Sequence, residues 1–357
     1  MDDSGILNLY FARSEQAIQE TDAKYAAYFS MQREQPLSDS QISYINENVQ
    51  DIQESQASGG CTIELKSALA EGTRAYITLG LSVPEDVDLT NLKDGEMLRF
   101  GDLDAIPEGS ELPAWASYQI MDDGDGKNHT VNVVMEIQPG RFLSEEEVTF
   151  GSGSTWKIVL QDILVDSWDE EYRQELLRTK YAGVTDFMFT EEEAARMHSQ
   201  ETLVSGKWEF EVELIADTNY LEFLTEPLLT KALVTRKNLA HYFDTKDAVE
   251  DITITSIQLR TLGATVTFEK PKDLEGGDFP GYHNTWIDMG DMYNSLTKLV
   301  NGDENFFVVL KDGTRIDFWQ GEGAIGTAYL KADSPIILAE VDYLQLSDGT
   351  KLYTPGA

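Results

Sequence analysis

The stretch KWEFEVEL at residues 207–214 alternates apolar and acidic side chains. Successive side chains of an extended strand point to opposite faces, so its apolar residues share one face and its glutamates share the other. The apolar set is Trp208, Phe210, Val212 and Leu214. One buried and one solvated face is typical of antiparallel sheets, because strands of parallel sheets are buried on both faces. The stretch therefore predicts a β-sandwich.

The chain has 357 residues, which exceeds the usual size of one domain, whereas a sandwich of immunoglobulin type needs about 100 residues. Alternating segments occur in two series, separated by a weakly patterned stretch at residues 216–230. We therefore expect a mainly β chain with two immunoglobulin-like antiparallel β-sandwiches, an N-terminal helical pair and helical inserts. The expected boundaries are 1–59 for the helical segment, 60–216 for the first sandwich with its inserts, and 217–357 for the second.

Strand patterns and turn residues define both series. The first series comprises residues 62–66, 75–83, 115–121, 130–137, 155–165 and 207–214, with helical inserts between the last two. The second comprises residues 251–259, 264–268, 305–310, 315–319 and 336–346. Glu71 and Gly72 form a turn in the first series, and Asp312-Gly313 has the signature of a tight hairpin in the second. The lengths and spacings suit antiparallel sandwiches.

Two helices are expected before the first strand. Apolar residues recur at four or seven positions from Leu7 to Phe29, which predicts a helix of about six turns. A second helix begins with Ser38 as N-cap and Gln41 three residues later as a capping box. Its predicted buried stripe is Ile42, Ile45, Val49 and Ile52. We expect the polar residues 53–60 to end it, with Gly59 and Gly60 as the break before the first strand.

Composition excludes one class of partner and leaves the compartment open. The net charge of −37 repels phosphate backbones, which excludes nucleic acid as a main partner. The lone cysteine, Cys61, cannot form an intramolecular disulfide, and we interpret it as a small buried residue. The sequence contains neither an apolar stretch of about 18–20 residues nor a basic n-region of a signal peptide, so we expect the chain as given to be soluble. Its start, Met1-Asp2-Asp3, is also compatible with a boundary just after an anchor.

Three acidic triplets invite two interpretations. They are residues 145–147, 169–171 and 191–193. Clustered carboxylates suit a cation site or the acid pair of a glycosidase. Each triplet, however, follows a potential capping residue, and acidic side chains are favoured in first helical turns by free N–H groups and the helix dipole. The potential caps are Ser144, Ser167 and Thr190. We favour the capping interpretation.

Two loops rich in glycine lack complete binding motifs. Residues 122–128, DDGDGKN, resemble a calcium loop in which Asp122, Asp123 and Asp125 would be ligands, but the bidentate glutamate of an EF-hand is absent. A turn between strands explains the same residues. Residues 151–154, GSGS, lack the lysine and the following helix of a phosphate-binding loop, so we expect an ordinary loop.

No catalytic constellation is evident in the sequence. The four histidines are far apart, and neither a His-Glu-x-x-His run nor a Gly-x-Ser-x-Gly elbow occurs. They are His129, His198, His241 and His283. We expect ordinary surface or core histidines, and we predict no catalytic residue, cofactor or metal ligand and no enzymatic activity.

Aromatic side chains give the most suggestive binding loop. Residues 276–286, GGDFPGYHNTW, combine glycines with rings that could stack on a sugar or a peptide. Tyr282, Trp286 and Trp319 are the candidates for such a role. The same rings could instead anchor a long crossover onto the second core, and we favour that interpretation.

Parts of both halves resemble known families. Residues 60–83, GCTIELKSALAEGTRAYITLGLSV, the loop before Trp156, and residues 206–210, GKWEF, are similar to the extracytoplasmic family known as domain of unknown function 4179. Residues 252–263 and the Ser334-Pro335-Ile336 segment resemble the immunoglobulin-like domain that often follows it. The two N-terminal helices are a departure from this family pattern.

The resemblance implies a Gram-positive membrane protein with this region outside the cell, in the role of an anti-sigma factor or envelope sensor. The expected location is the extracellular face of the cell membrane, as the ectodomain of a single-pass protein. Expected partners are an envelope protein or peptide, with a glycan as a further candidate. The alternative is a cell-surface carbohydrate-binding or adhesive module. No functional residues are defined for the family.

Overall fold

The computed structural model describes most of the chain. It covers residues 25–30, 36–72, 74–89, 92, 96–110, 113–121, 128–138, 150, 153–182, 188–238, 241–269, 286–287, 306–319, 323–324, 327–346 and 349–354. Residues 230–238, 241–252, 286–287, 319 and 323–324 are described for the backbone alone. The described chain is mainly β and belongs to the β-sandwich class, as the alternation predicted.

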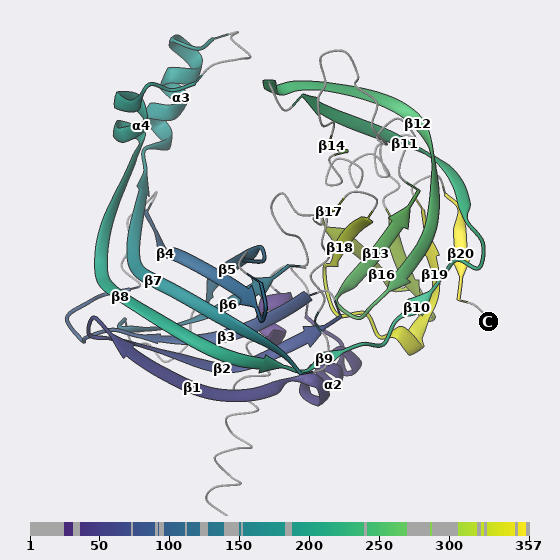
Figure 1. The fold of residues 1–357 in the computed structure, drawn as a ribbon, viewed down its shortest axis with the longest axis horizontal. Coiled ribbons are helices and arrows are strands. Elements are labelled where there is room, and N and C mark those ends of the chain that lie inside the picture. The colour runs from purple at the N-terminus through teal and green to yellow at the C-terminus, as the bar shows by residue number, and fades with distance from the viewer. Residues whose placement is uncertain are drawn as a thin grey trace, which may run out of the picture.

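Two sheets form the first β-unit, which lies at the bottom left of Figure 1. The larger sheet contains β1 (Gln50–Ser58), β2 (Cys61–Glu71), β3 (Arg74–Ser82), β6 (Thr130–Ile137), β5 (Ala116–Met121) and β9 (Ala216–Asp217). Its strand order is β1-β2-β3-β6-β5, and β9 pairs with β2 in parallel. The smaller sheet has the order β4-β7-β8, with β4 (Glu96–Pro107), β7 (Ser154–Trp168) and β8 (His198–Leu214).

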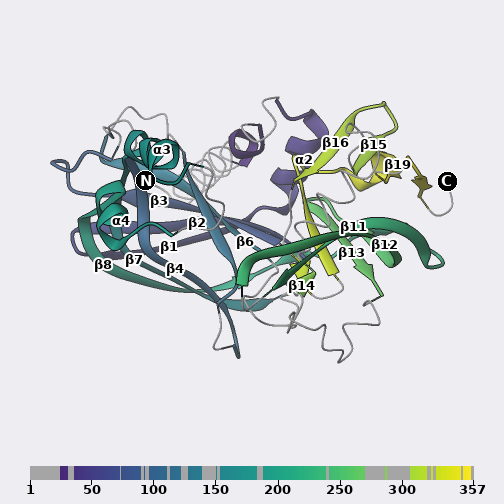
Figure 2. The ribbon, with the colours of Figure 1, turned by 90° about the horizontal axis from the view of Figure 1, so that it is seen from above.

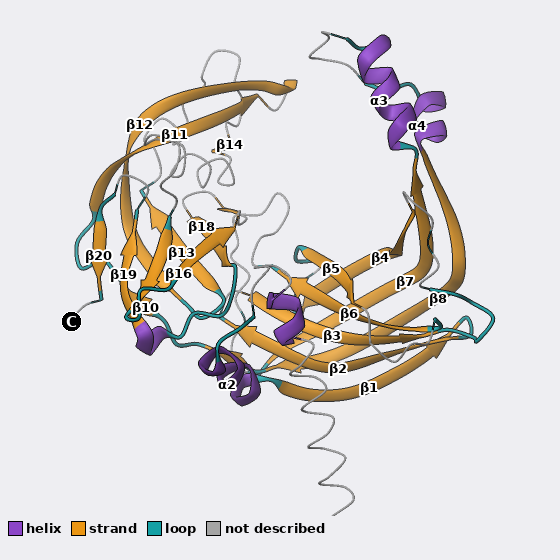
Figure 3. Cartoon of the chain, turned by 180° about the vertical axis from the view of Figure 1, so that it is seen from behind, coloured by secondary structure: helices purple, strands orange, loops and turns teal. Residues whose placement is uncertain are grey.

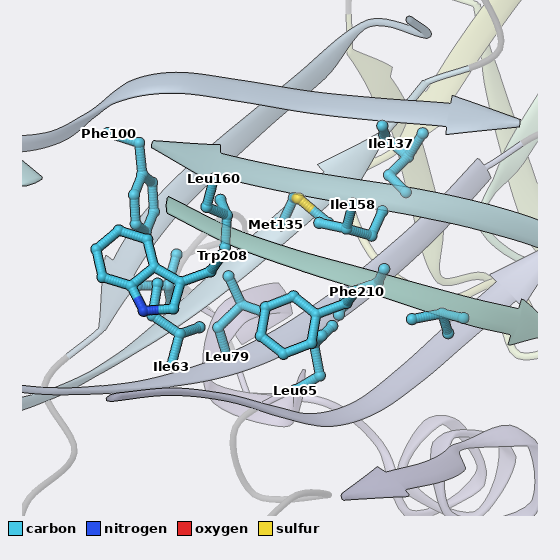
Figure 4. Packing of buried hydrophobic residues seen from close by; sticks show 14 of the residues in the cluster. Ile63, Leu65, Leu79, Phe100, Met135, Ile137, Ile158, Leu160, Trp208 and Phe210 are labelled. Atoms are coloured by element: carbon cyan, nitrogen blue, oxygen red, sulfur yellow. The ribbon is translucent and has the colours of Figure 1, made fainter. Parts of the chain in front are cut away.

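The core of the first unit lies between these two sheets. Trp208 and Phe210 of β8 are 0% and 2% exposed, and they lie close to Ile63, Leu65 and Leu79 of the larger sheet (Figure 4). The alternation at residues 207–214 is thus confirmed, and burying each such side chain contributes about 2 kcal/mol. The strand begins earlier than predicted, at His198, because its outer half is polar and pairs with β7 beyond the core.

The second unit is a curved eleven-stranded sheet (Figure 1). Its main order is β14-β11-β12-β13-β18-β16-β15-β19-β20, while β10 pairs with β12 and β17 with β18. The strands are β10 (Leu221–Glu222), β11 (Leu228–Asn238), β12 (His241–Leu259), β13 (Gly263–Phe268), β14 (Trp286–Ile287), β15 (Phe307–Leu310), β16 (Arg315–Trp319), β17 (Gly323–Ala324), β18 (Thr327–Ala332), β19 (Val341–Gln345) and β20 (Lys351–Tyr353). The Asp312-Gly313 hairpin is confirmed, with Gly313 at φ +89°.

The second unit has a hydrophobic core of its own. Ile254, Val266 and Ile316 are among its fully buried residues. The prediction of one strand across residues 336–346 was wrong, because the 3-10 helix η2 (Leu338–Glu340) precedes β19. The Glu340 N–H donates to the carbonyl of Ile337 within that turn.

The helices before the first sheet agree in part with those predicted from the sequence. Residues 25–30 are helical, and the earlier part of the predicted long helix lies outside the described residues. α2 (Asp39–Asn48) begins after Ser38, and the predicted capping box with Gln41 is confirmed. Its predicted stripe is wrong at two positions: Ile42 is 37% exposed and Ile52 belongs to β1, whereas Ile45 is buried.

The predicted break at Gly59 and Gly60 is wrong. Residues 50–58 form the strand β1, and the two glycines make the turn of the β1–β2 hairpin with φ +58° and +82°. The strand was missed because its side chains are polar and mostly exposed. Two of its glutamine side chains, Gln50 and Gln56, bond to the backbone of β8 and so cover that strand's edge.

Two helices cap the long β7–β8 pair, at the top left of Figure 1. They are α3 (Glu170–Thr179) and α4 (Glu191–Met197), the predicted inserts. Thr190 caps α4 and forms a capping box with Glu193, as predicted. Ser167 does not cap α3, because it lies within β7 and the side chain of Asp169 accepts from the Tyr172 N–H instead. Among the described residues, no helix combines the length and apolarity of a membrane span.

Candidate functional site

A third hydrophobic cluster joins the two β-units and the N-terminal helical residues. The helix at residues 25–30 contributes Tyr25, Tyr28 and Phe29, which pack on the outer face of the first sheet around Tyr76. Leu262, from the turn between β12 and β13, enters the same cluster from the second unit and is 1% exposed. Figures 2 and 3 show α2 beside this meeting point. We call this region the junction.

A buried ionic cluster lies within the junction. Glu136 on β6 forms ion pairs with Arg74 on β3 and, at 2.6 Å, with Lys331 on β18. The side chains of Arg74 and Glu136 are 3% and 5% exposed. Tyr28 donates a 3.2 Å hydrogen bond to the same carboxylate and accepts one of 3.0 Å from Lys331. The charged groups therefore connect the first unit, the second unit and the N-terminal helix.

The two cations determine the charge state of this carboxylate. Burial acts to raise the pKa of Glu136, but the charges and hydrogen bonds of Arg74 and Lys331 hold that pKa below its usual value. Burial lowers the pKa of Lys331, although Glu136 opposes this change. Burial also raises the pKa of Tyr28 far above its ordinary value. At neutral pH Glu136 is thus an anion between two cations, with Tyr28 as a neutral donor.

A second carboxylate, Glu71 at the end of β2, contacts the turn of the second unit. Its Oε2 accepts a 2.8 Å hydrogen bond from the backbone N–H of Leu262. The side chain is buried, and its Oε1 has no hydrogen-bond partner within the described structure. Burial raises the pKa of Glu71 to about 7, against the Leu262 N–H and the charges of Arg260 and Arg74.

The helix α2 also contacts both units. Tyr44 donates a 3.1 Å hydrogen bond to Asp217 of β9, in the first unit. Gln41 donates from its amide to Ser334 Oγ at 3.1 Å and to the carbonyl of Pro335 at 2.6 Å, in the second unit. Both helical segments therefore bond to both units, and a change in how the units meet has to alter these contacts.

The donors and acceptors of the junction suit positioning and proton exchange. In the described part of the chain, no group of three or more histidine, cysteine, aspartate or glutamate side chains is arranged to hold a metal ion. Arg74, Glu136 and Lys331 satisfy one another and are shielded from solvent. Glu71 is the carboxyl here whose pKa lies near neutral pH. The junction can therefore fix the two units relative to each other and respond to protons.

Sequence reasoning did not find the junction, although one signal was present. Glu136 stands in the run VNVVMEI at residues 131–137, where every other residue except Asn132 is apolar. A charged residue within such a run is buried with a partner or lies on a solvated face. The partners Arg74 and Lys331 are 62 and 195 residues away along the chain, so their meeting required the tertiary structure.

The residues that the sequence did single out do not gather at one place. Tyr282 lies outside the described residues, and Trp286 and Trp319 are described for the backbone, in β14 and β16. The acidic loop at residues 122–127 and the triplet at residues 145–147 also lie outside them, as does His283. The structure therefore tests neither the turn interpretation of the acidic loop nor the crossover interpretation of the aromatic loop, and their binding alternatives stay open. Cys61 is fully buried, as predicted, and burial raises its pKa to about 12.

One histidine takes part in a smaller polar group at the outer end of the β4-β7-β8 sheet. Asp166 forms a 2.7 Å ion pair with Arg99, and its Oδ1 lies 3.3 Å from His198 Nε2. His198 stacks on Trp168, which is 45% exposed. Burial opposes the ionised form of Asp166, but hydrogen bonds from Arg99 and Gln200 lower its pKa. The Arg99–Asp166 ion pair thus connects β4 and β7, and His198 of β8 lies beside it.

Comparisons with known proteins add little. No family model matches the chain, and no curated protein matches it. Among solved structures, it is similar to a conserved domain protein from Bacillus anthracis, with 9% identity, a TM-score of 0.40, and coverage of 84% of this chain and 77% of that chain. A likeness at this level carries no argument about fold or function.

Proposed function

We propose that the chain is a non-enzymatic extracytoplasmic domain of a bacterial membrane signalling protein, of the anti-sigma factor or envelope sensor type. One observation carries this proposal. Tyr28, in the helix that precedes both sandwiches, is hydrogen-bonded to Glu136 of the first unit and to Lys331 of the second. A change in the contact between the units would therefore alter the hydrogen bonds of this helix.

Signalling requires an element with two arrangements that a ligand can favour unequally. In this proposal the junction is such an element, because rotation of one unit against the other would separate Lys331 from Glu136 and withdraw Leu262 from the third cluster. The helical segments at residues 25–30 and in α2 would then lose bonds to one unit. A shift between units would thus become a change in the segment that precedes the first sandwich.

The partner that favours one arrangement is, in this proposal, an envelope protein or peptide. The outer half of β8, at residues 198–204, pairs with β7 along one edge and has mostly exposed side chains. β8 is the last strand of this sheet, so its other edge faces away from β7. Such an outer edge can accept an extended peptide through backbone hydrogen bonds. The acidic surface that follows from a net charge of −37 favours a basic partner.

The extracellular location can be tested with the cysteine that the chain already has. Cys61 is 0% exposed, so it should not react with a membrane-impermeant maleimide. We expect a Ser43→Cys variant, with the new thiol on the exposed face of α2, to be labelled on intact cells. Labelling of this variant in lysed cells, with none on intact cells, would contradict the location.

The signalling role is tested by breaking the junction in the native host. Lys331→Met removes the cation that connects Glu136 to the second unit. We expect this variant to change, without any stimulus, the transcripts controlled by one extracytoplasmic-function sigma factor. Lys207→Met is the matched control, because Lys207 is 57% exposed and pairs with its neighbour Glu209. The proposal fails if neither gene deletion nor Lys331→Met changes such a set of transcripts.

A further inference from the structure

Glu71 holds an unusual position in the junction. One of its oxygens accepts from the Leu262 backbone of the other unit, and the other oxygen has no partner in the described structure. The side chain is 1% exposed. A carboxylate that is buried with one unpaired oxygen is costly, whereas a protonated carboxyl carries no net charge into that site.

Charged and titratable groups from four elements interact with Glu71. They are Arg74 and Tyr76 of β3, Arg260 of the β12–β13 turn, Asp217 of β9 and Tyr44 of α2. The guanidinium of Arg260 lies over Gly72, where an added Cβ would be 2.9 Å from its Nη1. The arginines favour the ionised carboxyl, but Asp217 and burial oppose it. These opposing effects leave the protonated and ionised forms of the Glu71 carboxyl close in free energy near neutral pH.

Opening the junction would change that balance. Once Leu262 leaves, Glu71 meets water, and a solvated glutamate ionises readily at neutral pH. The open state therefore binds a proton less tightly than the closed state, so a rise in pH favours opening. Glu136 adds no pH dependence of its own near neutral pH, because two cations keep it ionised there.

We propose that the junction is a proton-operated switch, in which protonated Glu71 holds the β12–β13 turn of the second unit against the first sheet and ionised Glu71 releases it. The switch deepens the proposed function and rests on it for its role in the cell, since it makes external pH the signal. The burial of Glu71, which raises its pKa to about 7, places the transition near neutrality. The open-to-closed ratio would rise by about 300-fold across the transition.

Hydrogen exchange on the intact chain measures the switch directly, because the Leu262 N–H is the bond that Glu71 accepts. Exchange of residues 260–264 is followed from about pH 5.5 to about pH 8.5 and corrected for the intrinsic pH dependence of exchange. We expect protection of Leu262 to fall about 30-fold over this range, with most of the fall below pH 7 and a plateau above the pKa of Glu71. Protection of residues 209–213 in β8 should stay constant. Constant protection at Leu262 overturns the switch.

Two variants distinguish the titration of Glu71 from the titration of other carboxyl groups. Glu71→Gln should leave protection at Leu262 independent of pH, because the amide cannot titrate in this range. Glu64→Gln, on the same strand but exposed, should retain the wild-type response. A wild-type response in Glu71→Gln overturns the switch, and if this variant does not fold, the wild-type titration decides alone. The transcript experiment is independent of these measurements, so failure of signalling and failure of the switch are distinguishable.

Discussion

Lys331 of β18 donates a 2.6 Å hydrogen bond to Oε2 of Glu136 on β6, and this bond joins two β-units whose own cores lie apart. Arg74 approaches the other oxygen of the same carboxylate. Buried ion pairs contribute less to stability than their geometry suggests, since each charge is removed from water. Such pairs fix orientation, because an unpaired charge in the same place is far more costly.

Removal of Lys331 should therefore destabilise the chain. We expect Lys331→Met to lower the free energy of unfolding by about 3 kcal/mol, the low end of the range for broken buried pairs, because Arg74 still pairs with Glu136. Urea denaturation measures this change, and Lys207→Met should shift the free energy by less than about 0.5 kcal/mol. Equal effects of the two variants would show that Lys331 is not a structural partner.

The pKa of Glu71 makes a prediction about stability and pH. The folded-state pKa of about 7 lies above the ordinary value of 4.5, so this group's contribution to stability is complete below pH 4.5 and is lost as pH rises through 7. The loss should approach about 3 kcal/mol at alkaline pH. Urea denaturation at about pH 5.5 and about pH 8 should show about 2 kcal/mol of this loss. Glu136 is ionised at both values and does not contribute to the difference.

Glu71→Gln is the control for this titration. We expect the variant to show a much smaller difference in unfolding free energy between the two pH values, because the amide stays neutral throughout. Glu64→Gln should behave like the wild type, since Glu64 is exposed on the same strand. The same loss of stability in wild type and Glu71→Gln would assign the pH dependence to another group.

The sequence predicted local elements well where one physical signal dominated. At residues 207–214 the burial of four apolar side chains and the exposure of Glu211 and Glu213 followed the alternation, with Glu209 partly exposed. At Ser38 and Thr190 the capping chemistry is local, since each hydroxyl accepts from the N–H three residues later. Elements without a signal of their own, such as the polar strand β1, were missed because tertiary pairing forms them.

The candidate site was not predictable from the same signals. Glu136 and Lys331 each stand alone among apolar neighbours, and a single charge in a strand does not identify its partner. Ser167 shows the converse error, because a hydroxyl before an acidic triplet suggested a cap while Asp169, two residues later, provided it. Charge pairing between distant strands depends on topology, which one sequence does not give.

The glutamine side chains of β1 form hydrogen bonds to the backbone at the edge of β8, and these bonds can be tested by hydrogen exchange. Gln56 accepts a 3.0 Å hydrogen bond from the Glu209 N–H and donates one to the Glu209 carbonyl, as a neighbouring strand would. We expect Gln56→Leu to remove both bonds and to increase the exchange of the Glu209 amide about fivefold, the effect of losing about 1 kcal/mol. Glu54→Gln, exposed on the same strand, should leave that amide unchanged.

The turn between β1 and β2 allows a test of how closely the two sheets of the first unit meet. Gly59 has φ +58°, and a Cβ built on it would lie 2.0 Å from the carbonyl oxygen of Ser205 on β8. Gly109 has a similar φ of +79°, but nothing lies within 4 Å of the Cβ position. A side chain added at either glycine would therefore be strained by the positive φ, but only at Gly59 would it also meet a neighbouring strand.

Gly59→Ala should thus cost both the strain of the left-handed backbone and the steric contact with β8, whereas Gly109→Ala should cost the strain alone. We expect Gly109→Ala to lower the free energy of unfolding by about 1 kcal/mol, from left-handed strain alone. Gly59→Ala should lower it by about 3 kcal/mol, because the methyl group also pushes the hairpin away from β8. Chemical denaturation of both variants measures the difference, which should vanish if the hairpin and Ser205 are not in contact in solution. Faster exchange of the Lys207 N–H, which donates to Ser58 Oγ at 3.1 Å, should accompany the larger loss, because the displaced hairpin withdraws that acceptor.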